Sequence, residues 1–119
     1  MAVANPIASA DDWPQYRGPD RNGVSREKGL LKAWPEKGPK LLWTFRNAGL
    51  GFSPPSIVGQ RLYTMGTRGK VDFVYAIDTA TGERKALWSS AGANVVSLRF
   101  SPDGQSLMAG CSDHTARLW

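Results

Sequence analysis

The pattern of hydrophobic and polar residues in this chain changes near residue 40. Before that point, residues 11–40 read DDWPQYRGPDRNGVSREKGLLKAWPEKGPK, with a proline or glycine every few residues and no sustained period of 2 or 3.6. We expect an ordered but irregular segment there. Residues 30–34 could form one helical turn, which Pro35 would stop.

Three aromatic residues, Trp13, Tyr16 and Trp34, lie in this irregular segment. We expect them to pack on a neighbouring sheet, because large apolar side chains are usually covered. An exposed aromatic platform for a sugar or a base is the alternative.

After residue 40 the chain alternates apolar and polar residues over short runs, which predicts strands. Gly59-Gln60 separates two of these runs and predicts a tight hairpin, and Thr81-Gly82 marks a further turn. The expected strands number eight and lie in KLLWTFR (40–46), PSIVGQRLYTMG (55–66, two strands), VDFVYAID (71–78), ERKALW (83–88), VVSLRF (95–100), SLMAGC (106–111) and TARLW (115–119).

Alternation also predicts which side chains share a face. In 40–46 these are Leu41, Trp43 and Phe45, and in 95–100 they are Val96, Leu98 and Phe100. The strand at 71–78 is apolar on both faces, so we expect cover on both sides of it.

The spacing groups the strands as one, then four, then three. An all-β fold follows, and a sandwich, a barrel and a propeller all remain open at this level. The 119 residues fit one domain, and 13 glycines with 8 prolines agree with many turns and little helix.

Fifteen Lys and Arg against ten Asp and Glu give a formal charge of +5. This charge permits attraction to nucleic acid or to anionic lipid. The cations are scattered and form no run of five or more, so we expect no specific nucleic-acid site. No apolar stretch reaches eighteen residues, so no transmembrane helix is expected.

Residues 1–10 are expected to be a leader or the remnant of a signal peptide. Ala8-Ser9-Ala10 has the small-x-small form of a signal-peptidase site, although a cationic start is missing. We therefore expect a periplasmic or secreted location, or a cytoplasmic one if the leader is not such a remnant.

Two resemblances explain the strand pattern. The stretches WPQYRGPDRNGVS, WPEKGPKLLWTF, GFSPPSIVGQRLYTMG and VYAIDTATGE, within residues 11–82, resemble the opening of pyrroloquinoline-quinone-type β-propeller proteins, the quinoprotein-alcohol-dehydrogenase-like superfamily. VVSLRFSPDGQSLMAGCSDHTARLW, residues 95–119, resembles a single WD40 repeat. Both resemblances imply a propeller of four-stranded blades, with structural motif residues at Asp78, Thr81, Gly82, Trp88, Asp103, Gly104, Asp113 and Trp119.

These resemblances divide the chain into a leader (1–10), an irregular segment (11–39), a quinoprotein-like blade with a preceding strand (40–88) and a WD40-like blade without its outer strand (89–119). Two departures stand out. Gly82 and Trp88 are six residues apart where the family usually has four, and Ser90-Ala91 stands where a WD40 repeat has Gly-His. We expect the second blade to be weaker than a typical one.

Residues with catalytic or metal-binding chemistry are few. Cys111 and His114 have a ligand-like separation, but one Cys and one His cannot supply the four ligands of a structural zinc site, so we expect a buried cysteine and a turn histidine. No Gly-x-Ser-x-Gly elbow accompanies the histidine. We expect no catalytic, cofactor or metal site.

The resulting expectation is a non-catalytic propeller module of about two blades that binds proteins or acts as a scaffold. The alternative is a fragment of a pyrroloquinoline-quinone-dependent dehydrogenase, which would need more blades to enclose the quinone and its calcium. Because the last blade lacks a strand, we expect residues 40–46 of a neighbouring copy to complete it head to tail, in a ring of three or four copies, with four preferred.

Overall fold

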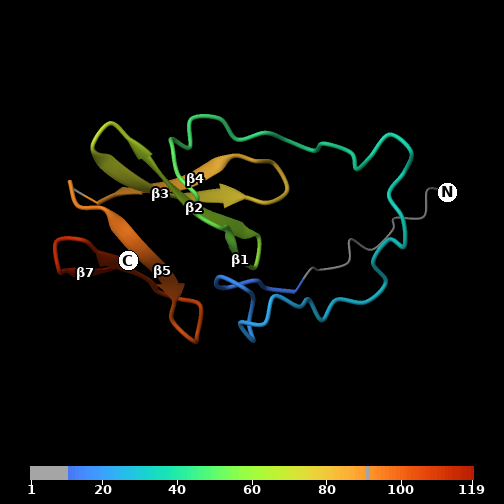
Figure 1. Cartoon of the computed structure of the whole chain (residues 1–119), viewed down its shortest axis with the longest axis horizontal. Helices are drawn as coiled ribbons and strands as arrows, with labels where there is room; N and C mark the ends of the chain where they lie inside the picture. Colours follow the sequence, from blue (N-terminus) through green and yellow to red (C-terminus); the bar gives the residue numbers. More distant parts are fainter. Residues whose placement is uncertain (1–10, 91) are drawn as a thin grey trace.

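Seven strands in two antiparallel sheets make up the fold in a computed structural model that describes residues 11–90 and 92–119 (Figure 1). The strands are β1 (Ser56–Val58), β2 (Arg61–Arg68), β3 (Val71–Asp78), β4 (Arg84–Ser89), β5 (Val95–Phe100), β6 (Leu107–Cys111) and β7 (Ala116–Leu118). No helix occurs in these two described ranges. The all-β prediction is confirmed at this level, and the expected leader at residues 1–10 lies outside the described residues.

Each sheet is a meander in which every strand pairs with the next strand along the chain. The orders are β1-β2-β3-β4 and β5-β6-β7. The hairpin predicted at Gly59-Gln60 is confirmed, since Val58 pairs with Arg61 across it. Gly59 has φ 57°, the positive value that such a two-residue turn requires at its first central position.

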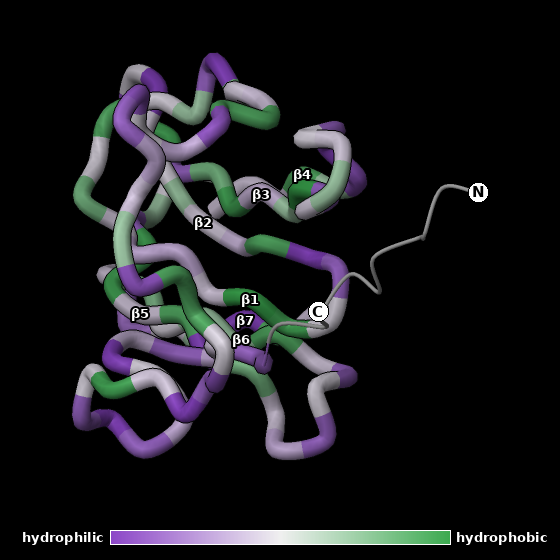
Figure 2. The backbone as a smooth tube through the Cα atoms, turned by 90° about the vertical axis from the view of Figure 1, so that its right-hand side faces the viewer, coloured by the Kyte–Doolittle hydropathy of each residue, from purple (hydrophilic) through white to green (hydrophobic). Residues whose placement is uncertain are grey.

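The two sheets pack face to face around one apolar cluster. Met65, Val74 and Trp88 form a row across β2, β3 and β4 on the side that faces the second sheet. The second sheet contributes the buried residues Val95, Leu107, Ala109 and Cys111. In Figure 2 the strands β2, β3 and β4 lie above β5, β6 and β7.

The expected cover on both faces of β3 is confirmed, because Val74, Tyr75, Ala76 and Ile77 are almost completely buried. The second face of β3 is covered by the irregular chain before β1, where Phe45 meets the Tyr75 ring edge-on at 5.4 Å. In Figure 1 this chain crosses the top of the molecule.

The strand predicted at residues 40–46 does not form, so the structure has seven strands where eight were expected. Trp43 and Phe45 are half-buried against the first sheet, as their spacing predicted, but Leu41, expected on the same face, is exposed. The backbone, however, has no neighbouring strand. Beyond β1, the edge of β2 is instead occupied by Leu50, which exchanges two hydrogen bonds with Thr67 (2.9 and 2.7 Å).

Residues 11–39 are irregular, as predicted, and of their three aromatic side chains only that of Trp13 is partly buried, with its ring against Gly18. Trp13 exchanges two backbone hydrogen bonds with Ile57 of β1 (2.7 and 2.8 Å). Tyr16 and Trp34 are 70% and 69% exposed, so the packing prediction is wrong for these two side chains.

The helical turn expected at residues 30–34 is absent. One turn fixes several dihedral angles for a single hydrogen bond, and this segment has no tertiary surface that would offset the cost. A turn follows instead, in which the Gly38 N–H donates to the Pro35 carbonyl at 2.7 Å.

A β-bulge corrects the predicted face of Val96. The pairing of β5 with β6 shifts between Val95 and Ser97, so Val95 turns inward and Val96 is 69% exposed. Leu98 and Phe100 keep the inward face that their alternation predicted.

Candidate functional site

Three turns at the ends of the sheets hold most of the predicted motif residues. In the first, the Asp78 carboxylate accepts hydrogen bonds from the Ala80 and Thr81 N–H groups (2.9 and 3.0 Å). These bonds, chiefly that from Thr81, hold the pKa of Asp78 below its ordinary value. Gly82 closes the turn at φ 73°, and its Cα lies directly against the Trp43 indole, which leaves no room for a side chain.

The second turn joins β5 to β6. The Asp103 carboxylate accepts from the Ser101 hydroxyl and from the Gln105 N–H, and the first of these bonds is the main reason that the pKa of Asp103 is lowered. The Gly104 N–H donates to the Ser101 carbonyl at 2.8 Å, with Gly104 at φ 69°.

The third turn joins β6 to β7 and contains Asp113. Its carboxylate accepts from the Thr115 hydroxyl (2.6 Å) and from Arg117 (3.0 Å), and the Thr115 bond is the main cause of the lowered pKa of Asp113. Arg117 also donates to the Cys111 sulfur at 2.9 Å. His114 is exposed at the tip of the turn with φ 63°. Cys111, through its bond from Arg117, and His114 are therefore both parts of the turn structure.

Trp88 and Trp119, the remaining two motif residues, meet where the sheets pack together. Their ring centroids are 6.0 Å apart, with the ring planes inclined by 38°. Each side chain is partly buried against the shared core. The Trp119 backbone exchanges two hydrogen bonds with Leu107 (2.8 and 2.9 Å), so the end of the chain is docked on β6.

A buried carboxylate that the sequence analysis missed links the two sheets. Asp72 accepts from the Thr67 hydroxyl (2.5 Å) and from the Val95 N–H (2.7 Å), which joins the β2–β3 hairpin to the first residue of β5. The Asp72 and Ser90 backbones are paired as well, at 2.9 Å. A charged residue inside the otherwise apolar run VDFVYAID was the available signal, since a buried carboxylate needs such partners.

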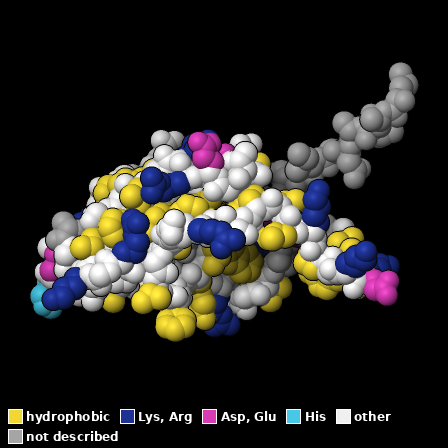
Figure 3. All heavy atoms as spheres, turned by 90° about the horizontal axis from the view of Figure 1, so that it is seen from above, with side chains coloured by type: hydrophobic (Ala, Val, Ile, Leu, Met, Phe, Trp, Pro, Cys, Tyr) yellow, Lys and Arg dark blue, Asp and Glu magenta, His cyan; other side chains and the backbone are white. Residues whose placement is uncertain are grey.

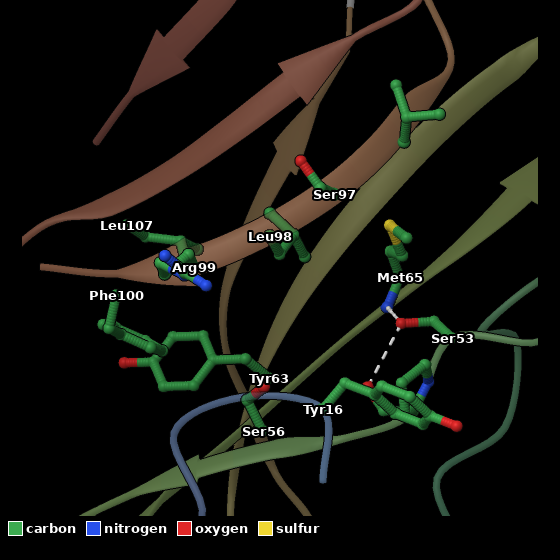
Figure 4. Close-up of a pocket in the computed structure, with 12 residues that line it drawn as sticks. Tyr16, Ser53, Ser56, Tyr63, Met65, Ser97, Leu98, Arg99, Phe100 and Leu107 are labelled. Carbon is green, nitrogen blue, oxygen red and sulfur yellow. Dashed lines mark hydrogen bonds between the residues drawn. The ribbon is translucent and has the colours of Figure 1, made fainter. Parts of the chain in front are cut away.

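A cavity of about 210 Å³ lies between the sheets (Figure 4). The Tyr63 and Phe100 rings are in edge-on contact at 4.6 Å in its wall, and Met65 and Leu98 also line it. Every buried side-chain nitrogen or oxygen in the described part of the chain has a hydrogen-bond partner. No fully buried polar side-chain atom of the described residues is therefore left without a partner to orient a ligand, and we interpret the cavity as a packing gap.

Larger hollows lie on the outer face of the second sheet. Two adjoining hollows of about 490 and 530 Å³ lie between this sheet and the loop at residues 14–21. They share Gln15, Arg21, Arg99 and Met108 in their walls. These walls combine apolar strand residues with two arginines. Such a surface is better suited to bind a protein than to bind a small polar ligand.

Within residues 11–90 and 92–119, no group of three or more His, Cys, Asp or Glu side chains is placed to hold a metal ion. In the same ranges, no helix is long and apolar enough to cross a membrane. The arrangement brings together turn-stabilising and packing residues, and its open feature is the outer face of the second sheet.

One curated protein shows similarity to the chain. It is Protein tipD of Dictyostelium discoideum, which is 30% identical over 108 residues. The match covers 85% of this chain but only 17% of the length of tipD. No protein-family profile matches the chain, and no solved structure matches it.

Proposed function

We propose that the chain is a β-propeller-type module of about two blades that binds proteins and has no catalytic role. One observation carries the proposal: two consecutive meanders pack face to face, with Trp88 and Trp119 in contact between them. Propellers are built from such small antiparallel sheets. The quinoprotein-like and WD40 resemblances support the same interpretation, and the former is our ground for proposing a periplasmic or secreted location.

The proposed binding surface is the outer face of β5-β6-β7 together with the free edge of β7. Met108 and Leu118 are neighbours on that face and both are exposed. Trp119 directs its N–H and C=O toward β6, so by alternation the backbone groups of Ala116 and Leu118 point away from the sheet. An open edge of this kind readily accepts another strand.

We propose a second copy of the chain as the partner, in a head-to-tail ring of three or four copies, with four preferred. The expected donor of the added strand is residues 40–46 of the neighbouring copy, which would have to exchange the contacts that this segment makes in the single chain. Residues 40–46 lie on their own first sheet, where the Trp43 Nε1–H donates to the Thr79 carbonyl at 2.9 Å. Repeated contacts of one type close into a ring when the rotation per copy divides a full turn.

A pair of charged substitutions on the proposed surface tests the assignment. Met108→Glu with Leu118→Glu should shift the purified protein to the monomer in a sizing column, because the carboxylates would lose hydration in the contact. Val24→Glu is the matched control, since Val24 is also exposed but lies in the irregular segment. An unchanged size for the double variant would contradict the proposed surface.

A further inference from the structure

Exposed apolar side chains concentrate in one stretch of the irregular chain, residues 28–52, which we call the strap. Leu30, Leu31 and Trp34 are exposed in its first part. In its second part Leu41, Leu42, Leu50 and Phe52 are exposed, and Phe52 projects completely into solvent. More than half of the large exposed hydrophobic residues described in the chain therefore lie in the strap.

Positive charge concentrates in the same stretch. The strap holds five of the fifteen cationic residues, Lys28, Lys32, Lys37, Lys40 and Arg46, and only one of the ten carboxylates, Glu36. It carries four of the five net positive charges of the chain, although it is about a fifth of its length. Exposure and charge are separate properties, and both single out this segment.

The strap cations are free to meet an anionic partner. None of the five forms an ion pair with a described residue, because the three ion pairs there join Arg26 to Asp20, Lys85 to Glu83 and Arg117 to Asp113. Hydrophobic and cationic side chains lie interleaved on the face seen in Figure 3, which is the side that the second part of the strap crosses at the top of Figure 1, whereas its first part runs along the right-hand side of Figure 1.

The second part of the strap is fixed in place on the first sheet. Phe45 packs on Tyr75, and the Tyr75 hydroxyl donates to the Asn47 carbonyl at 3.2 Å. Leu50 is held by its backbone bridge to Thr67. The exposed side chains of the second part thus project from a segment that is anchored to the first sheet.

We propose that the strap binds the surface of an anionic lipid bilayer. Projecting Leu, Trp and Phe side chains can enter the boundary between headgroups and acyl chains, and neighbouring lysines are attracted to anionic headgroups. Tryptophan suits this boundary because its ring is both apolar and polar. The surface differs from the β7 edge, so the proposal does not depend on the ring.

Lipid explains both properties of the strap, whereas a nucleic acid explains only one of them. A phosphate backbone would attract the cations but would leave the projecting leucines and Phe52 in water. An acidic protein would need a pocket shaped for each projecting side chain, whereas a bilayer deforms around them.

Flotation of the full chain with lipid vesicles tests the proposal. Vesicles of phosphatidylcholine with phosphatidylserine should carry the protein, and vesicles of phosphatidylcholine alone should carry about tenfold less of it. Raising the salt concentration from 0.1 to 0.5 M should weaken the binding by a similar factor. Blue-shifted fluorescence on binding should be reduced in Trp34→Phe, because Trp34 is the exposed tryptophan of the strap.

Two pairs of substitutions distinguish vesicle binding by the strap from non-specific binding by other exposed hydrophobic residues. Leu41→Ser with Phe52→Ser should reduce vesicle binding about tenfold, because both side chains are exposed and neither supports the fold. Val24→Ser with Leu87→Ser, also exposed but outside both the strap and the proposed surface of the second sheet, is the matched control and should leave binding unchanged. Failure to float with anionic vesicles, equal effects of the two pairs, or stronger binding to duplex DNA or polyglutamate than to vesicles would overturn the proposal.

Discussion

At position 82, both the backbone conformation and the packing require a glycine. Its φ of 73° is unfavourable for other residues, and an added Cβ would lie 2.7 Å from the Trp43 ring. Gly82→Ala should therefore lower the free energy of unfolding by about 2 to 4 kcal/mol, the sum of backbone strain and overpacking. Urea denaturation measures this change.

Gly104→Ala is the matched control for that change. Gly104 has a similar φ of 69°, but an added Cβ would make only an ordinary contact with Val58 at 3.6 Å. Gly104→Ala should therefore lower the free energy of unfolding only by the cost of backbone strain, about 1 to 2 kcal/mol. Equal losses for the two variants would show that the contact between Gly82 and Trp43 does not constrain the fold.

Asp72 should be needed for its acceptor atoms more than for its charge. Asp72→Ala leaves the Val95 N–H and the Thr67 hydroxyl without their partner and should cost about 2 to 4 kcal/mol of unfolding free energy. Asp72→Asn should cost less, because its oxygen can accept from Val95 while its NH₂ group donates to Thr67. Thermal denaturation of both variants would contradict this account if Asn were as harmful as Ala.

The three aspartate turns should make the stability of the fold sensitive to acid. The pKa values of Asp78, Asp103 and Asp113 are lowered from 3.8 in the folded chain. The ionised carboxylates thus stabilise the fold above about pH 4, and this contribution is lost as the pH falls through the lowered values. Urea denaturation from pH 7 to pH 3 measures the loss.

Replacing the three turn aspartates with Asn provides the comparison for that pH series. The variant cannot titrate at these positions, so its unfolding free energy should fall less steeply below pH 4 than that of the unchanged chain. If the two pH profiles ran parallel, the turn carboxylates would not be the source of the acid sensitivity.

Elements were predictable from the sequence where a local signal fixes the backbone. Gly59 defines its hairpin, and the apolar run at 71–78 defines a strand covered on both faces. Alternation correctly predicted that the Trp43 side chain lies on the first sheet. It did not predict that Leu50, and not residues 40–46, pairs with the edge of β2. Alternation reports which side chains are buried, whereas strand pairing depends on distant partners.

The candidate surface was less predictable than the strands. The bulge at Val96 depends on the pairing with β6, and the partners of Asp72 lie in different hairpins. The bulge and the bond from Val95 to Asp72 arise from long-range contacts that no local pattern encodes, whereas the charge of Asp72 inside an apolar run was a local signal. The strap has five cations and one carboxylate in the printed sequence, but these cations form no continuous run and are scattered along it; their position beside exposed apolar side chains is seen only in the structure.

At the scale of the whole molecule, the two sheets should unfold together. Trp88→Ala and Trp119→Ala should each cost about 3 kcal/mol of unfolding free energy, because each removes a ring from the shared core. Their rings touch, so the double variant should lose about 0.5 to 1.5 kcal/mol less than the sum of the single losses. Strict additivity in this double-mutant cycle would mean that the tryptophans do not couple the sheets.

The central claim is that the module is completed by copies of itself through the open face and edge of the second sheet. Light scattering on the purified chain at micromolar concentration, with circular dichroism to confirm strand content, tests it most directly. The account predicts one defined mass of three or four chains, with four preferred. A folded monomer with native strand content, or a continuous series of sizes, would contradict it.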